Sequence, residues 1–158
     1  MENDRRTFSR EFPSSRYAVE EGASPPAGCA CTVEEDLDRV LEGLRILIVE
    51  DELLPALELE HMVEDLGGEV VGPAPRLHDA RQLAQSESLD GAILDMNLCG
   101  ETTLPFLEEL LARGIPVVLA TGYGADILPE HLADTPLLPK PYDEIALQEV
   151  AERHLGRP

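Results

Sequence analysis

The chain has 158 residues and a formal net charge of −20, from 32 acidic and 12 basic side chains. This length suits one compact domain with an extension. Direct DNA binding is not expected, because such an acidic surface would repel the phosphate backbone of nucleic acid. No run of residues approaches the roughly 20 apolar positions of a membrane-spanning helix, and the polar residues 1–10 do not resemble a secretory signal, which predicts a cytoplasmic protein.

The first 43 residues are predicted to form a flexible acidic extension. They show no clear apolar period until near their end and contain the acidic run 34–36. Apolar residues then recur at helical spacing, which predicts a short helix over residues 33–43. Cys29 and Cys31 have no second Cys or His pair at zinc-like spacing, so they are interpreted as ordinary thiols.

From residue 44 onward, short apolar runs alternate with segments of helical periodicity. The apolar runs predict strands over residues 45–49, 69–72, 92–95, 116–120 and 135–138. The periodic segments predict helices over residues 54–66, 77–86, 104–112 and 143–155, the last with Asp143 as its N-cap. One more segment, residues 125–131, is short and interrupted by Pro129, which predicts partly irregular structure.

Strands that alternate with helices in this way indicate a parallel sheet covered on both faces. A common solution is the doubly wound α/β fold, flavodoxin-like, with five parallel strands in the order 2-1-3-4-5. Function then gathers at the carboxyl ends of the strands, beside the switch point between the first and the third. The helix over residues 54–66 is expected to bury Leu57, Met62, Val63 and Leu66.

Polar side chains follow four of these five strands at the same end. The first strand ends in Glu50 and Asp51, the third in Asp95, the fourth in Thr121 and the fifth in Lys140. Because carboxyl ends of parallel strands meet at one edge, these groups are expected to lie together. Carboxylates crowded together repel one another unless a cation joins them, and oxygen ligands favour Mg²⁺. The set of parts fits phosphoryl transfer to a carboxylate.

The same segments resemble the signature segments of two-component response-regulator receiver domains. The resemblance covers about residues 44–156, and its motifs are specific when taken together. The segments that carry it are Ile46-Leu47-Ile48-Val49-Glu50-Asp51-Glu52, Ile93-Leu94-Asp95-Met96-Asn97-Leu98, Ala120-Thr121-Gly122 and Lys140-Pro141.

The resemblance implies a role for each of these polar groups. Asp95 would be the phosphoryl acceptor. Glu50, Asp51 and Asp95 would hold Mg²⁺, with the backbone carbonyl of Asn97 as a further ligand. Lys140 would contact the phosphoryl group, and the peptide bond between it and the following proline would be cis.

The switch residues depart from the common receiver pattern. The resemblance makes Thr121 the switch hydroxyl, but Leu137 stands where most receivers carry an aromatic residue, three positions before the lysine. Tyr123 follows Gly122 instead, so the segment resembles the subfamily with a Phe-Ala-Thr-Gly-x-Tyr motif, with Leu119 in place of Phe and one residue fewer before the tyrosine. Members of that subfamily are often single-domain regulators linked to sensor histidine kinases. Tyr123 is therefore expected to move between exposed and buried positions as Thr121 engages phosphate.

Two more departures bear on function. Leu98-Cys99-Gly100-Glu101 stands where a proline usually follows the acceptor loop, and three residues follow the last predicted helix, so no output domain is expected. The resemblance implies a stand-alone regulator, not a turnover enzyme. It would receive its phosphoryl group from a sensor histidine kinase or a histidine phosphotransfer protein docked on the first helix. It would then signal by protein–protein contact or act as a phosphate sink, in an oligomeric state that the sequence leaves open.

Other readings of this fold stay open to different degrees. The altered switch residues allow an unphosphorylated receiver-fold interaction module. A phosphatase with an aspartate nucleophile would need a second carboxylate two residues further on, where Asn97 stands. A flavin- or nucleotide-binding protein would need a glycine-rich phosphate loop after the first strand, which the sequence lacks.

Overall fold

The computed structural model describes residues 39–122 and 128–156 of the chain. Expectations that fall on other residues lie outside this part. They concern the extension before residue 39, with Cys29 and Cys31, and the switch residue Tyr123. None of the helices in the two described segments combines the length and the apolar character that crossing a bilayer requires.

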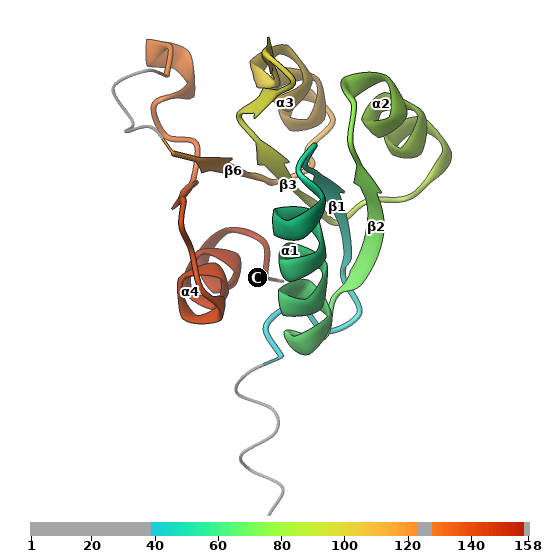
Figure 1. Ribbon diagram of the computed structural model, residues 1–158, viewed down its shortest axis with the longest axis vertical. Coiled ribbons are helices and arrows are strands. Elements are labelled where there is room, and N and C mark those ends of the chain that lie inside the picture. Colours follow the sequence, from blue (N-terminus) through green and yellow to red (C-terminus); the bar gives the residue numbers. More distant parts are fainter. Residues whose placement is uncertain (1–38, 123–127, 157–158) are drawn as a thin grey trace, which may run out of the picture. The chain divides into compact units, whose positions relative to one another are not determined.

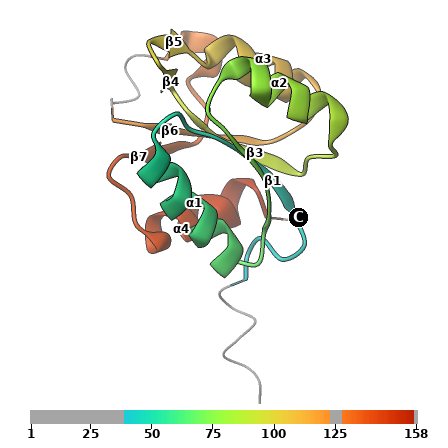
Figure 2. The same ribbon diagram turned by 45° about the vertical axis from the view of Figure 1, so that its right-hand side comes forward.

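Five parallel strands form the central sheet (Figure 1, Figure 2). They are β1 (Arg45–Val49), β2 (Glu69–Ala74), β3 (Gly91–Asp95), β6 (Val117–Thr121) and β7 (Leu137–Pro139). Their spatial order is β2-β1-β3-β6-β7, and every neighbouring pair runs parallel. The predicted strand order, with the third strand beside the first, is therefore confirmed, and so is the doubly wound α/β class.

The described α-helices cover both faces of this sheet (Figure 2). One face carries α1 (Leu53–Asp65) and α4 (Glu144–His154), and the other carries α2 (Leu77–Ser86) and α3 (Leu104–Ala112). β1 supplies both layers because successive side chains of a strand point to opposite faces. Thus α1 and α4 pack with Ile46 and Ile48, whereas α2 and α3 pack with Leu47 and Val49.

The residues just ahead of β1 form a turn that packs against the end of α1. Residues 40–43, the described end of the helix predicted over 33–43, are a turn and not helical. Leu41 is fully buried, and its N–H donates to the carbonyl oxygen of Leu66 over 3.0 Å. Gly67 has a φ of +85°, the left-handed conformation that ends many helices. The packed domain therefore begins before its first strand.

The buried face of α1 differs from the predicted one. Val63 and Leu66 are buried as expected, but Leu57 is 41% exposed and Met62 is only half-buried. The prediction for Leu57 was wrong because apolar residues surround the first half of this helix, so periodicity did not fix the helical phase. The side chains of the helix that are buried are Ala56, Leu59 and Val63.

Two local elements refine the prediction. A short antiparallel hairpin of β4 (Asn97–Leu98) and β5 (Glu101–Thr102) follows β3 and was not expected. Within the described part of the irregular segment predicted over 125–131, one short 3-10 turn, η2 (Glu130–Leu132), follows Pro129. The hairpin matters for the site because its turn residue Cys99 contacts Asp51, at the carboxyl end of β1.

Candidate functional site

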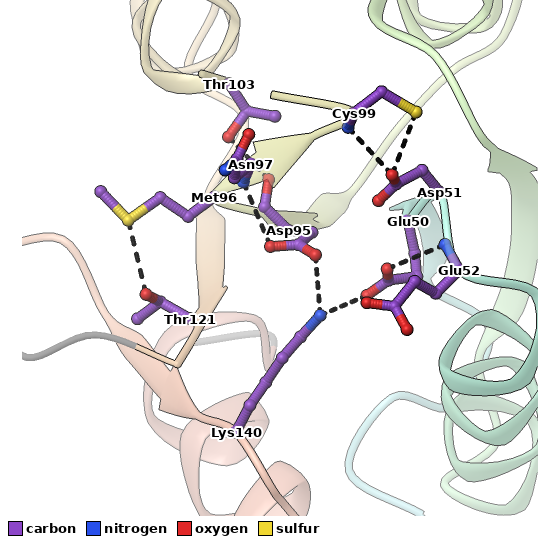
Figure 3. Close-up of polar contacts among 10 residues, drawn as sticks. All are labelled: Glu50, Asp51, Glu52, Asp95, Met96, Asn97, Cys99, Thr103, Thr121 and Lys140. Carbon is purple, nitrogen blue, oxygen red and sulfur yellow. Dashed lines mark hydrogen bonds and ion pairs between the residues drawn. The ribbon is translucent and has the colours of Figure 1, made fainter. Parts of the chain in front are cut away.

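Three carboxylates converge at the carboxyl ends of β1 and β3 (Figure 3). Asp95 is the last residue of β3, and Glu50 and Asp51 follow β1 directly. The register of these strands pairs Val49 with Leu94, so their carboxyl ends lie side by side. One carboxylate oxygen from each of the three acids lies within 4.8 Å of the others. The Glu50 side chain is only 1% exposed, so its charge depends on partners within the protein.

Lys140 supplies an ammonium group to two of these carboxylates. Its Nζ lies 2.6 Å from Oε2 of Glu50 and 2.8 Å from Oδ2 of Asp95 (Figure 3). The lysine follows β7, its N–H donates to the carbonyl oxygen of Thr121, and the peptide bond to Pro141 is cis, as the resemblance implied. Partial burial acts to lower the pKa of Lys140, but hydrogen bonds to Asp95 and Glu50 outweigh it and raise that pKa. The ammonium therefore stays charged.

Asp51 is held by a partner that the sequence did not indicate. Its Oδ2 accepts two hydrogen bonds from Cys99, from the backbone N–H over 2.9 Å and from the thiol over 3.1 Å (Figure 3). Partial burial acts to raise the pKa of Asp51, but the bonds from Cys99 outweigh it and lower the pKa. The same contact raises the pKa of the Cys99 thiol, which keeps it protonated and poorly nucleophilic.

The part of this arrangement that the sequence could have indicated is the turn after β4. Cys99 has a φ of +50°, and Gly100 follows with a φ of +87°. Two left-handed residues in a row form the tight reversal between β4 and β5. A Cys-Gly pair beside a strand end indicates such a turn, but not the side chain toward which it points.

The backbone around Asp95 is also fixed by hydrogen bonds. The N–H of Asn97 donates to Oδ1 of Asp95 over 3.2 Å, and the Thr103 hydroxyl donates to the Asp95 carbonyl oxygen over 2.7 Å. Thr103 is fully buried and precedes α3, where a threonine would ordinarily cap the helix. Its side chain makes no capping bond. Sequence analysis missed this residue because a threonine before a helix gives the same sequence pattern whether it caps the helix or binds the end of β3.

Thr121 lies at the end of β6, beside β3. It follows Ala120, which pairs with Asp95, and it is only 2% exposed. Its hydroxyl donates to the sulfur of Met96 over 3.4 Å, away from the Asp95 carboxylate (Figure 3). Leu137, where most receivers carry an aromatic residue, is half-buried in β7 and pairs with Leu119.

The charges of the site fit an oxygen-coordinated cation. Three carboxylates converge, and Lys140 is the one cationic side chain that the described contacts bring to them. Two negative charges therefore remain at full ionisation. Carboxylates this close repel each other in the absence of a further positive charge, and oxygen-only donors are those that hard divalent cations prefer. The donor set of Glu50, Asp51 and Asp95 is thus suited to such an ion.

Comparisons with known proteins give the family. No family model matches the chain. The phyllosphere-induced regulator PhyR of Methylorubrum extorquens is 34% identical over 114 residues, which make up 70% of this chain and 43% of PhyR. The chain spans about half the length of the curated relatives that it matches.

Two solved structures are covered almost completely. SdrG from Sphingomonas melonis Fr1 is 38% identical with a TM-score of 0.61, over 68% of this chain and 92% of SdrG. The PhyR response regulator REC domain of Erythrobacter litoralis is 25% identical with a TM-score of 0.65, over 71% of this chain and 89% of that domain. With a 38% identical relative matched over nearly its whole length and the same fold, the chain belongs to the receiver-domain family of response regulators, which are signalling proteins.

Proposed function

We propose that this protein is a phosphorylation-controlled switch in which Asp95 accepts a phosphoryl group in a Mg²⁺-dependent reaction. The observation that carries the proposal is the place of the Asp95 carboxylate. It lies 2.8 Å from the Lys140 ammonium and within 4.8 Å of two further carboxylates, at the sheet edge where receiver-like folds gather function. A carboxylate so placed has a positive partner on one side and a cation site on the other. As a single-turnover acceptor, the protein is not a turnover enzyme.

The transfer itself follows from these positions. An Asp95 oxygen forms a bond to phosphorus while the bond from phosphorus to the donor, a histidine nitrogen, breaks and its electron pair leaves with that nitrogen. Lys140 is placed to donate to an equatorial oxygen of the phosphoryl group. Mg²⁺, held by Glu50, Asp51, Asp95 and the backbone carbonyl of Asn97, would supply charge neutralisation for the same oxygens. The low pKa of Asp51 supports this role because an ionised carboxylate is the better ligand.

The switch would follow from Thr121. Its hydroxyl lies at the next strand end and could donate to a phosphoryl oxygen on Asp95 once it leaves Met96. Leu137 cannot hydrogen-bond or stack as an aromatic residue would, so Tyr123 is the proposed partner in the conformational change. That proposal belongs to the Phe-Ala-Thr-Gly-x-Tyr resemblance, and Tyr123 lies outside the described residues.

The start of α1 supports docking of the phosphoryl donor beside the site. Leu53 and Leu54 are 73% and 71% exposed, although large apolar side chains are usually buried. They follow Asp51 by two and three residues, so a partner that covers them also reaches the acid cluster. We propose that this surface receives a sensor histidine kinase or a histidine phosphotransfer protein.

A pocket next to these leucines offers polar contacts to the same partner. It has a volume of about 380 Å³ and is lined by Glu52, Pro55, Glu58, Lys140, Pro141 and Tyr142. The Tyr142 hydroxyl is buried and has no hydrogen-bond partner among the described residues. Burial raises the pKa of Tyr142 to about 12. The polar groups that the pocket presents to a partner are therefore those of the exposed Glu52 and Glu58. Output by protein–protein contact and drainage of phosphate both remain compatible with such a surface.

Intact mass spectrometry tests the proposal. The protein is incubated with Mg²⁺ and acetyl phosphate, beside Asp95→Asn and, as a matched control, Asp134→Asn, which changes an exposed aspartate after η2. We expect one base-labile phosphoryl group on the wild type and on the control, and none on Asp95→Asn. If neither acetyl phosphate nor phosphorylated histidine kinases load the wild type, the protein is instead an unphosphorylated interaction module.

A further inference from the structure

Met96 is the residue directly after the acceptor aspartate, and its side chain turns toward the end of β6. Its sulfur accepts the hydrogen bond from the Thr121 hydroxyl over 3.4 Å (Figure 3). The methionine is half-buried and packs against the core cluster that α2 and α3 form with the sheet. Thr121 is buried as well, so this contact is sheltered from water.

The backbone of Met96 is fixed by hydrogen bonds to two neighbouring segments. Its N–H donates to the carbonyl oxygen of Ala120 over 3.0 Å, and its carbonyl oxygen accepts from the N–H of Thr103 over 3.1 Å. Both backbone groups are therefore bound to neighbouring segments. A rotation of the Met96 or Thr121 side chain can therefore separate the hydroxyl from the sulfur while these backbone bonds stay in place.

We propose that Met96 is a positioning residue that holds the Thr121 hydroxyl away from Asp95 in the unphosphorylated protein. In this way it sets how readily the phosphorylated conformation forms. The proposal rests on the proposed function of Asp95. A thioether is a weak acceptor, whereas a phosphoryl oxygen is a charged and strong one. The hydroxyl therefore stays on the sulfur at rest and transfers to the phosphoryl group when one is present.

Substitutions of Met96 distinguish a hydrogen-bonding role of this residue from a role in packing alone. Methionine often fills irregular gaps in a core, and Thr121 could lie beside it by chance of packing. Leucine has nearly the same volume and no acceptor, and glutamine has similar length and a stronger acceptor. If the hydrogen bond matters, the two substitutions shift the switch in opposite directions. A packing defect would shift both variants in the same direction.

The first test measures the affinity of the full chain for beryllium fluoride, a phosphoryl analogue, in saturating Mg²⁺. We expect Met96→Leu to bind about threefold more tightly than the wild type and Met96→Gln about tenfold more weakly, as hydrogen bonds of these strengths imply. Met62→Leu is the matched control, because it makes the same chemical change at a half-buried methionine of α1 on the other face of the sheet. It should leave the affinity unchanged.

The second test removes the hydroxyl. In a Thr121→Ala background, Met96→Leu and Met96→Gln should no longer differ from the Thr121→Ala single variant, because the coupled group is gone. Effects that persist in this background would overturn the proposal, as would wild-type, leucine and glutamine proteins of equal affinity. A wild type that binds no beryllium fluoride would overturn the proposed function together with this one, so the two failures are distinguishable.

The third test examines the resting contact without phosphate. The chain has 3 methionines, so the methyl signal of Met96 is readily assigned in an NMR spectrum of methyl-labelled protein. Thr121→Val should shift that signal. Thr135→Val, at another buried threonine, should not. An unchanged Met96 signal in Thr121→Val would show that the hydroxyl does not reach the sulfur in solution, and would overturn the proposal.

Discussion

The acid side and the hydroxyl side of the site differ in how firmly their polar groups are held. On the acid side, Lys140 reaches Glu50 and Asp95 over 2.6 and 2.8 Å, both contacts between charged groups. On the hydroxyl side, Thr121 donates to a neutral sulfur over 3.4 Å. Charge-assisted bonds are roughly twice as strong as neutral ones, and a thioether is a weak acceptor. The groups proposed for chemistry are thus joined by charge-assisted bonds, whereas the bond between Thr121 and Met96 is one that a stronger acceptor can replace.

The largest effect should come from removal of the ammonium on the acid side. We expect Lys140→Met to lower the initial rate of phosphoryl gain from acetyl phosphate by about 100-fold or more, because the buried Glu50 loses its partner and the phosphoryl oxygens lose a donor. Intact mass at short times gives the rate. Lys140→Arg keeps the charge but not the compact ammonium, so its rate should lie between those of the wild type and Lys140→Met. A rate for Lys140→Met within about threefold of wild type would show that the ammonium is not needed.

Loss of one carboxylate should have the next largest effect. We expect Glu50→Gln and Asp51→Asn each to weaken Mg²⁺ binding by about tenfold or more, since each removes a charged oxygen ligand. Lys140 is the only lysine of the chain, so an NMR titration of its labelled side chain reports the site through a single signal. Glu52→Gln is the control, because Glu52 is an exposed neighbour outside the acid cluster. Equal weakening in all three variants would mean that only overall charge matters.

The backbone support of the acid side can be tested through Thr103. We expect Thr103→Val to lower the free energy of unfolding by about 1 kcal/mol, because the buried carbonyl oxygen of Asp95 loses a hydrogen-bond donor. Urea unfolding measures the change. Thr102→Val, at the exposed neighbouring threonine, should change stability much less. Equal stability of the two variants would argue that β3 does not depend on this bond.

The smallest effect concerns Asp51 and its dependence on pH. Hydrogen bonds from Cys99 lower the pKa of Asp51. A carboxylate with a lowered pKa makes its contribution above its ordinary pKa and loses it as the pH falls through the lowered value. We therefore expect Cys99→Ala to raise the pKa of Asp51, so that Mg²⁺ binding fails at a higher pH than in the wild type. Carboxyl NMR titration measures this pKa. Cys99→Ser, which keeps a donor, should stay closer to wild type, and an unchanged pKa in Cys99→Ala would remove the role of the thiol.

The residues on the acid side of the site could be predicted from the sequence, but the contacts on the hydroxyl side could not. Glu50, Asp95 and Lys140 come together because parallel strands deliver their carboxyl ends to one edge, and each residue directly follows or ends a strand. The bond from Thr121 to Met96 depends on the rotation of two side chains. No periodicity or spacing in the sequence carries that information.

The same reasoning explains the other differences. Cys99 reaches Asp51 because a left-handed turn folds the β4–β5 hairpin back, and two-residue strands leave no apolar pattern. Leu57 was assigned to the core because α1 has leucines around its whole first half. A helix of this kind has a defined buried face only once the sheet is present to select it.

The two ends of the described domain lie at the same edge of the sheet. The described chain begins with the turn at residues 40–43, which packs beside Leu66, just after the end of α1. The start of α1 lies near the site, and its 13 residues span about 20 Å, so this turn is far from the site. At the other end, Leu155 packs against Gly91, the first residue of β3. Both ends therefore emerge at the edge of the sheet opposite Asp95. A tether or an affinity tag attached at either of these two ends would therefore start at the edge of the sheet that is farther from Asp95, which is the favourable edge for immobilising the domain.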